Sequence, residues 1–135
     1  MRGKARFWLL LVLAAAVLAG ACGGDDDGPP LEGTEWALAS GVDVPGDADP
    51  PTLLLEEGNA SGFGGCNTFT GGYELDGDSI SIGPLAGTLM ACELQKMAVE
   101  GAYMPALEAA DAWSIDGDEL VLSSGGEETL RFSSA

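Results

Sequence analysis

The amino-acid sequence predicts an α+β domain, a curved, mostly antiparallel sheet or incomplete barrel of about seven strands with one helix. Short segments that alternate polar and apolar residues, separated by turn residues, run along most of the chain and indicate strands. Two of them, residues 73–82 and 113–122, share one hairpin pattern. Only residues 93–110 have helical spacing. Because the edges of such a sheet must be covered, we expect it to curl, with the helix packed against it.

The first predicted strands precede a glycine-rich stretch. Residues 34–38 alternate polar and apolar and predict a strand. Glycine, aspartate and three prolines in residues 41–51 indicate a surface loop. Residues 52–56 carry three consecutive leucines and predict a second strand. A turn at residues 57–59 then returns the chain into a hairpin partner at residues 60–63.

The two similar segments are predicted to be hairpins. In each, an aromatic residue, an aliphatic residue two places on and Asp-Gly-Asp precede alternating aliphatics, 40 residues apart in the chain. Glycine adopts the positive φ that such a tight turn requires. The competing interpretation is metal binding, but each segment has two carboxylates and lacks the glutamate that an EF-hand loop requires. We therefore expect hairpins and no metal site.

The predicted helix carries a proline. One apolar stripe recurs at spacings of three and four, formed by Leu94, Met97, Gly101, Met104 and Leu107. The ring of Pro105 clashes with the carbonyl four residues earlier and removes a hydrogen bond, so we expect a kink or two short helices. A turn at residues 123–126 and a last strand at residues 129–132 complete the domain.

Charge and composition exclude several functions. The 135 residues include 22 acidic and five basic ones and no histidine, for a formal net charge of −17. Three basic residues lie in the first six positions, so a chain starting at Cys22 keeps only Lys96 and Arg131. Such a chain has too few cations for sequence-independent nucleic-acid binding or for a basic membrane-binding patch. The lack of histidine excludes catalysis or metal binding through an imidazole.

The N-terminus has the pattern of an export signal. Residues 7–21 form an unbroken apolar or small run of 15 residues after a basic start. A membrane-spanning helix needs about 20 apolar residues, so the run is typical of a signal peptide instead. Its end, Leu18-Ala19-Gly20-Ala21-Cys22, resembles the lipobox of bacterial lipoproteins. We expect a signal peptide over residues 1–21 and lipidation of Cys22; the alternative is ordinary cleavage and a soluble secreted protein.

An acidic linker follows the expected anchor. Residues 22–30 contain glycine, proline and three consecutive aspartates, which predict a disordered spacer. A calcium site at Asp25–Asp27 is the competing interpretation, but the three acids lack the alternating ligand spacing of a calcium loop. We thus expect an exported, extracytoplasmic protein held to a membrane by Cys22, in a compartment where disulfides persist.

The two remaining cysteines, Cys66 and Cys92, have two interpretations. In an oxidising compartment an even pair predicts a disulfide, and closing a loop of this length stabilises a chain by about 3.5 kcal/mol. Alternatively Cys66, flanked by glycine and asparagine, is an exposed nucleophile. A reactive thiolate needs a base or a cationic neighbour, and the chain has no histidine and few cations.

The glycine-rich block around Cys66 also has two interpretations. It could be a binding loop whose amides hold an extended peptide or an anionic group. It could instead be a bulged crossover that places Cys66 opposite Cys92 and lets Asn67 hydrogen-bond its own backbone. No lysine and helix follow the block, so it is not a P-loop. The nearby aromatic residues are expected in the core or at the rim of the concave face: Trp36, Phe63, Phe69, Tyr73 and Trp113.

Four groups of residues resemble the META domain, or HslJ-like, family. They are Gly33, Thr34, Trp36 and Leu38; Gly62, Phe63, Gly64, Gly65, Cys66, Asn67, Thr68 and Phe69 with Gly71 and Tyr73; Thr88, Met90, Ala91 and Cys92; and Leu130, Arg131 and Phe132. The match runs from about residue 31 to residue 132, so residues 31–135 are the expected domain. Leu89, at a position that is often basic, and Pro105, inside the helix, depart from the family pattern.

The resemblance implies a small α+β domain with a curved antiparallel sheet, often exported and often a lipoprotein. It also implies roles in the heat-shock response, novobiocin resistance and, in other branches, secretion or virulence. No enzymatic activity is established for the family. These implications name a place in the cell envelope without a mechanism.

Three hypotheses about function follow. The first is a monomeric, lipid-anchored, non-catalytic envelope protein that supports stress tolerance or integrity by binding a protein or a small apolar ligand. The second is a carrier of a lipid or other hydrophobic ligand, with an interior pocket lined by aromatics and by Met90 or Met97. The third is a hydrolase with paired carboxylates, which would need one raised pKa in an apolar cleft. We expect no catalytic residue, cofactor, metal or nucleic acid for the first.

Overall fold

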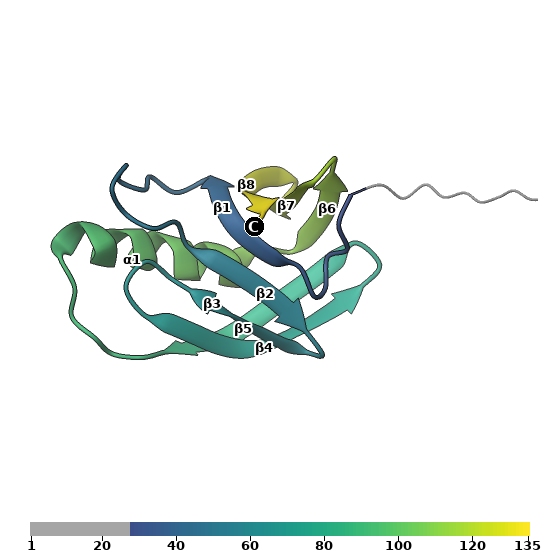
Figure 1. The fold of residues 1–135 in the computed structure, drawn as a ribbon. Coiled ribbons are helices and arrows are strands. Elements are labelled where there is room, and N and C mark those ends of the chain that lie inside the picture. Colours follow the sequence, from purple (N-terminus) through teal and green to yellow (C-terminus); the bar gives the residue numbers. More distant parts are fainter. Residues whose placement is uncertain (1–27) are drawn as a thin grey trace, which may run out of the picture.

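The computed structural model describes residues 28–135 (Figure 1). The expected signal peptide, the expected lipidation site at Cys22 and most of the expected linker lie outside these residues. Within residues 28–135, no helix has the length and apolar character needed to cross a membrane.

Eight antiparallel strands and one helix make up the domain, as the predicted α+β class requires, with one strand more than expected. The strands are β1 (Glu35–Ser40), β2 (Thr52–Glu56), β3 (Asn59–Phe63), β4 (Thr68–Asp76), β5 (Ser79–Gly87), β6 (Ala112–Asp116), β7 (Glu119–Ser124) and β8 (Glu127–Ser134), and the helix is α1 (Leu94–Ala109). Each strand pairs with the next, and β1 pairs with β8, so the sheet curls into a ring. Only Ser79 and Ala112 are in register between β5 and β6. The ring is therefore an incomplete barrel, and α1 connects the two strands at its weakest side.

The hairpins lie where the sequence predicts them. Glycines with positive φ close the β4–β5 turn at Gly77 (62°) and the β6–β7 turn at Gly117 (66°). The β2–β3 turn uses Glu57 and Gly58, which also have positive φ. The positive φ turns the chain in the sense that matches the twist of the two strands. Both Asp-Gly-Asp segments are thus hairpin turns.

The glycine-rich stretch belongs partly to the sheet, because β4 already begins at Thr68. A Cβ atom on Gly71 would lie 2.5 Å from the carbonyl oxygen of Pro84 in β5. Only glycine permits this close approach of two strands, and the register shifts there between Gly71 and Tyr73. The composition of the stretch obscured its strand character, since glycine is rare in regular strands.

Helix α1 continues through Pro105 as a single helix, so the division into two short helices is wrong. The carbonyl that loses its hydrogen-bond partner belongs to Gly101. Both Gly101 and Pro105 are exposed, so the break in the hydrogen-bond ladder lies on the solvent side of the helix. A missing partner costs least there.

The predicted apolar stripe of α1 is not the face that the fold buries. The buried residues are Val99, Tyr103 and Leu107, at spacings of four, and of the predicted stripe only Leu107 is buried. The Tyr103 ring contacts Phe69 and Phe132 edge to face, with centroids 6.1 and 6.3 Å away. Its hydroxyl donates to the carbonyl of Thr52 (2.7 Å). The buried face is thus chosen by the aromatic ring and hydroxyl of Tyr103, which find partners inside the sheet.

The interior of the sheet is filled. Trp36 is fully buried, and its indole N–H donates to the carbonyl of Leu31 (3.0 Å). The other side chains without solvent contact come from four strands and α1: Leu53, Leu55, Ala60, Leu120, Leu122, Leu130, Phe132, Tyr103 and Leu107. Phe69 and Tyr73 are also buried, whereas Phe63 and Trp113 lie half-buried at the rim.

The interior pocket expected for a hydrophobic carrier is therefore not present within residues 28–135, because α1 and the aromatic side chains occupy that space. Met90 and Met97, one of which was expected to line it, both lie on the surface. This corrects the carrier hypothesis as the sequence suggested it.

Candidate functional site

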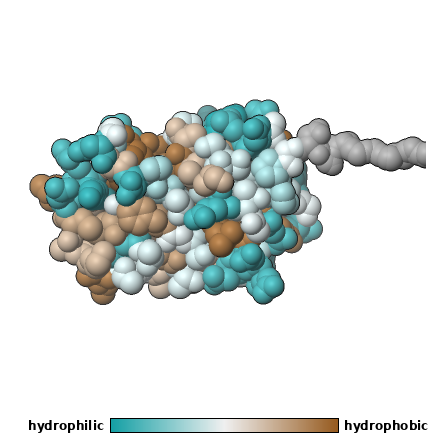
Figure 2. Space-filling view, viewed as in Figure 1, coloured by the Kyte–Doolittle hydropathy of each residue, from teal (hydrophilic) through white to brown (hydrophobic). Residues whose placement is uncertain are grey.

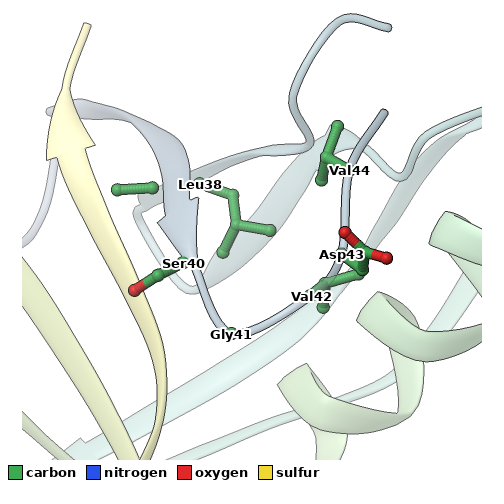
Figure 3. Close-up of a pocket in the computed structure, with 7 residues that line it drawn as sticks. Leu38, Ser40, Gly41, Val42, Asp43 and Val44 are labelled. Carbon is green, nitrogen blue, oxygen red and sulfur yellow. The ribbon is translucent and has the colours of Figure 1, made fainter. Parts of the chain in front are cut away.

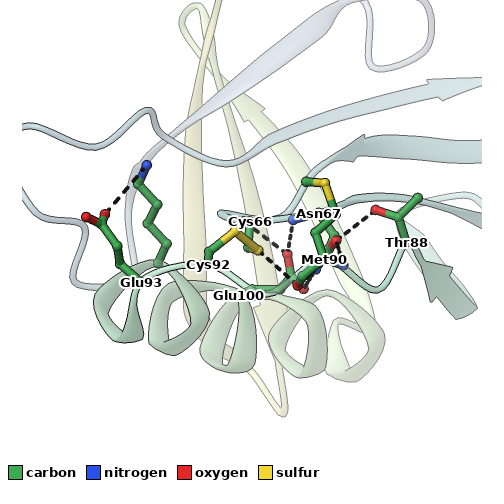
Figure 4. Close-up of a disulfide and its surroundings, with 8 residues drawn as sticks. Cys66, Asn67, Thr88, Met90, Cys92, Glu93 and Glu100 are labelled. Atoms are coloured by element: carbon green, nitrogen blue, oxygen red, sulfur yellow. Dashed lines mark hydrogen bonds and ion pairs between the residues drawn. A yellow bond between two sulfur atoms is a disulfide. The ribbon is translucent and has the colours of Figure 1, made fainter.

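A disulfide joins two loops beside α1 (Figure 4). Cys66 and Cys92 have Cα atoms 6.0 Å apart and stand 26 positions apart in the chain. The bond ties the end of the glycine-rich block to residues 88–93, which we call the display loop. Because both thiols are consumed, Cys66 is a structural cysteine in this state and the nucleophile interpretation does not apply.

Asn67 connects the same two loops from within. Its side chain is buried, and its Oδ1 accepts hydrogen bonds from the Thr88 hydroxyl (2.8 Å) and the Met90 N–H (2.7 Å). Its Nδ2 donates to the Met90 carbonyl (3.4 Å) and to Oε2 of Glu100 (2.9 Å). The expected bond of Asn67 to its own backbone is therefore replaced by bonds to the display loop and α1. A buried amide with all its groups paired holds its neighbours in one arrangement.

Glu100 supplies the anion for the backbone amides of the glycine-rich block. Oε1 accepts hydrogen bonds from the N–H groups of Cys66 (3.1 Å) and Asn67 (2.6 Å). Partial burial raises the pKa of Glu100, but the hydrogen bonds from Asn67 and Cys66 outweigh it and hold the pKa below its ordinary value. The anion-binding interpretation thus describes an internal contact, since a carboxylate of the same chain occupies these two amides.

Glycines 64 and 65 make that contact possible. A Cβ atom on Gly64 would lie 2.9 Å from the Glu100 carboxylate, and one on Gly65 would lie 2.9 Å from the Val99 side chain. Gly65 also has φ of 123°, a conformation that side chains disfavour. The block is therefore a crossover that lets α1 approach closely, as its structural interpretation predicts.

Three of the other motif residues, Gly33, Thr34 and Tyr73, lie apart from this site and attach the start of the domain to the sheet. The Gly33 N–H donates to the Leu55 carbonyl (2.8 Å), and the Thr34 hydroxyl donates to the Pro30 carbonyl (2.7 Å). The Tyr73 hydroxyl donates to the Glu32 carboxylate. Burial and this hydrogen bond raise the pKa of Tyr73. The motif thus serves two places in the fold and not one site.

Apolar side chains are exposed on the display loop and along the outer side of α1. The exposed fractions are 99% for Leu89, 58% for Met90, 86% for Leu94 and 46% for Met97. Farther along α1, the exposed residues include Ala98, Gly101, Ala102, Pro105 and Ala109. We call these nine residues the apolar face. Figure 2 shows apolar surface at the end of the molecule where the loop before α1 and the start of α1 lie.

The sequence carries a signal for this face, but helical periodicity does not distinguish it from the signal of a core face. Seven of the ten exposed residues of α1 are apolar or glycine, and the exceptions are Gln95, Lys96 and Glu108. An outward helix face is normally polar. A helix with apolar residues on both sides has two candidate core faces, and periodicity alone cannot assign them.

A surface hollow follows β1 and is a weaker candidate (Figure 3). It has a volume of about 480 Å³ and is lined by consecutive residues from Leu38 to Val44. Asp43 is its single ionisable group. The hollow therefore follows the curve of one chain segment and assembles no set of distant side chains.

The carboxylates give no support to the hydrolase hypothesis. Such an enzyme needs an acid whose pKa is raised in an apolar cleft. Within the described part of the chain, the two carboxyl groups with a shifted pKa are Glu100 and Glu128, and both are lowered. Hydrogen bonding to Arg131 lowers the pKa of Glu128. Residues 28–135 also contain no group of three or more side chains suited to hold a metal.

Both cations among residues 28–135 are paired with acids. Arg131 contacts Glu119 (2.7 Å), Glu128 (2.9 Å) and Asp116 (3.1 Å) on the outside of β6 to β8. Lys96 lies 3.8 Å from Glu93 at the start of α1. The apolar face therefore has acidic neighbours and no unpaired positive charge within the described residues.

Comparisons with known proteins agree with this fold. A family model of the META domain matches residues 29–135. A protein from Burkholderia xenovorans, solved by NMR, is similar over 87% of this chain and 95% of its own, with 30% identity and a TM-score of 0.66. A second NMR structure is similar in fold over 76% of this chain and 90% of its own, with 23% identity and a TM-score of 0.58. None of the curated proteins compared with the chain matches it. The chain belongs to the META domain family, for which no catalytic role is known.

Proposed function

We propose that this protein is a non-catalytic, lipid-anchored protein of the cell envelope that supports stress tolerance or envelope integrity by binding a partner. The observation that carries the binding role is the display loop. Leu89 and Met90 are exposed, yet a disulfide and three hydrogen bonds of the buried Asn67 side chain hold the loop around them. A loop that is rigid and apolar at once is preorganised for contact, because little entropy is lost when a partner covers it.

The filled interior supports the same role. Because Tyr103 and Leu107 fill the space that the sheet encloses, an apolar ligand has no interior site among the described residues. Binding therefore takes place on the outer surface of the domain. The anchor rests on the sequence: the apolar run of residues 7–21 followed by Cys22. Two acyl chains would hold the domain on a membrane stably.

The anchor is tested by Cys22→Ser in cells that make the protein. We expect the wild-type protein to partition into the detergent phase and the variant into the aqueous phase, because only the former carries acyl chains. Cys66→Ser is the matched control, since it changes a cysteine inside the folded domain and should leave partitioning unchanged. Equal partitioning of wild type and Cys22→Ser would contradict the anchor.

The envelope role is tested with a deletion strain grown under heat, with novobiocin and with detergent. We expect reduced survival in at least one condition, restored by the wild-type gene and not by the Cys22→Ser gene. Survival equal to that of the parent strain in all three conditions would contradict the proposed role.

A further inference from the structure

We propose that the apolar face docks an amphipathic helix of a partner protein, whose apolar side is bordered by lysine or arginine. The inference rests on the proposed function and names its binding surface and the chemistry of its partner. Three features of the described residues carry it: the apolar exposure of α1, the space beside its small residues, and the charge around it.

The apolar exposure extends over one continuous side of α1. Leu94, Ala98, Pro105 and Ala109 recur at spacings of four and seven, and Met97 flanks them. The opposite side of the helix, with Val99, Tyr103 and Leu107, is already buried in the sheet. The outer side thus has the pattern of a second packing face that lacks a partner within residues 28–135. Met90 and Met97 add flexible, polarizable side chains that adapt to another surface.

The middle of the face offers room for a helix. Ala98, Gly101 and Ala102 are small and exposed, and a Cβ atom added to Gly101 would meet no atom within 4 Å. Small residues on a helix let a second helix approach closely enough for its side chains to fill the groove. The larger side chains of Leu89, Leu94 and Met97 lie before these small residues in the chain, where they can pack against the end of the incoming helix.

Charge selects the class of partner. Residues 28–135 contain 19 acids and two cations, and both cations are paired. Glu93, at the start of the face, pairs with Lys96, and Asp47 lines the same hollow beside them. Glu108 lies near the far end of the face. An anionic lipid surface or a second copy of the domain would add like charge, whereas lysine or arginine at the border of a partner helix would be attracted. The apolar face therefore fits a basic amphipathic helix best.

The test uses three synthetic helical peptides with one identical apolar side and lysine, glutamine or glutamate at its borders. The full chain is produced as Cys22→Ser, so that no detergent competes for the peptides. Binding is measured by fluorescence anisotropy at about 50 mM and about 500 mM salt. We expect the lysine peptide to bind at least about tenfold more tightly than the glutamate peptide at low salt, with a smaller ratio at high salt.

Variants locate the contact. Leu94→Gln with Met97→Gln should weaken binding of the lysine peptide at least about tenfold, because the contacts of two large exposed apolar side chains are lost. Leu54→Gln is the matched control: Leu54 is half-buried on the outward side of β2, between the buried Leu53 and Leu55. Gly101→Leu should fill the space beside Gly101 and raise helix propensity. Weaker peptide binding with unchanged or higher thermal stability would then show that the peptide no longer fits, while the domain still folds.

Several outcomes would overturn the proposal. They are the absence of lysine-peptide binding, equal binding of the lysine and glutamate peptides, or an equal effect of Leu54→Gln and the double variant. A dimer in sedimentation that the double variant dissociates would assign the face to a second copy of the chain instead. If the double variant restores a sensitive deletion strain as well as wild type does, the envelope role stands and this docking surface is wrong.

Discussion

The two sides of helix α1 are both apolar, but the inner side packs into the fold and the outer side is exposed. The inner side packs Val99, Tyr103 and Leu107 into the sheet, where each buried side chain adds to the free energy of unfolding. The outer side exposes Leu94, Met97 and small residues that add little to folding. Apolar residues on one side of a helix therefore do not by themselves identify the side that is buried. The following changes test this division, from the largest expected effect on stability to the smallest.

Replacing the central inner residue should have the largest effect. Tyr103→Ala removes a fully buried aromatic ring, its contacts with Phe69 and Phe132 and a hydrogen bond to Thr52, and should lower the free energy of unfolding by about 4 kcal/mol. Urea unfolding followed by circular dichroism measures the loss. Met97→Ala is the control on the outer side, with an expected change within about 0.5 kcal/mol. Similar losses for both variants would refute the division between the two sides.

Removing the disulfide should come next. Cys66→Ser with Cys92→Ser opens a loop of 26 positions and should lower the free energy of unfolding by about 3.5 kcal/mol. Unfolding of the wild type with and without a reductant provides the matched comparison. The double variant should be insensitive to the reductant. A wild type with the same unfolding midpoint in both conditions would show that the bond does not stabilise the domain.

The contribution of the Glu100 carboxylate to the free energy of unfolding should depend on pH. Glu100→Gln weakens three hydrogen bonds to Cys66 and Asn67 and should cost about 1–2 kcal/mol near neutral pH. Because the pKa of Glu100 is lowered by folding, its contribution is complete above the ordinary value of 4.5 and is lost as the pH falls through the lower folded value. The difference between wild type and variant should therefore shrink in acid. A difference that stays constant from pH 7 to strong acid would be inconsistent with an ionised Glu100.

Tyr103 should also limit stability in alkali. Burial raises its pKa well above 10.0, so the folded state keeps the neutral phenol while the unfolded chain ionises. The stability is complete below pH 10.0 and is lost as the pH rises towards the folded pKa. Tyr103→Phe should cost about 1 kcal/mol at neutral pH through the lost bond to Thr52, yet flatten the alkaline decline. Tyr73→Phe tests whether the smaller decline that remains comes from the second tyrosine with a raised pKa. An unchanged alkaline limb in Tyr103→Phe would exclude Tyr103 as its source.

The outer side of α1 should tolerate polar side chains. Leu94→Gln exchanges an exposed side chain of α1 and should change the free energy of unfolding by less than about 0.5 kcal/mol. Thermal unfolding and the m-value for urea measure whether the fold is intact. A loss of more than about 2 kcal/mol would show that Leu94 packs against the domain and is not available to a partner.

Local chemistry explains which features the sequence predicted well. An Asp-Gly pair between alternating segments specifies a hairpin within a few residues, and both hairpins are present at Gly77 and Gly117. The disulfide was predicted by elimination. If the protein is exported and Cys22 carries the lipid anchor, Cys66 and Cys92 have only each other as partners. Strands β2 and β3, which run from Thr52 to Phe63, likewise follow from a local residue pattern and the turn between them.

Features that depend on distant residues were missed. The amides of Cys66 and Asn67 look available for an anion in the sequence, but Glu100, which follows them by more than 30 positions, accepts both. The expected bond of Asn67 to its own backbone fails for the same reason, because the display loop offers it better partners. No local pattern contains these pairings.

The class of fold and the turns follow from the sequence, because polar–apolar alternation and a glycine with positive φ are properties of short segments and single residues. The sequence also restricted Cys66 and Cys92 to two interpretations, of which the structure contains the disulfide. Tertiary structure alone decided which side of α1 is buried. Both sides carry enough apolar surface, and the choice depends on what the sheet offers: the Tyr103 ring reaches Phe69 and Phe132, and its hydroxyl reaches Thr52. That choice leaves Leu94 and Met97 on the outside, where a partner can reach them.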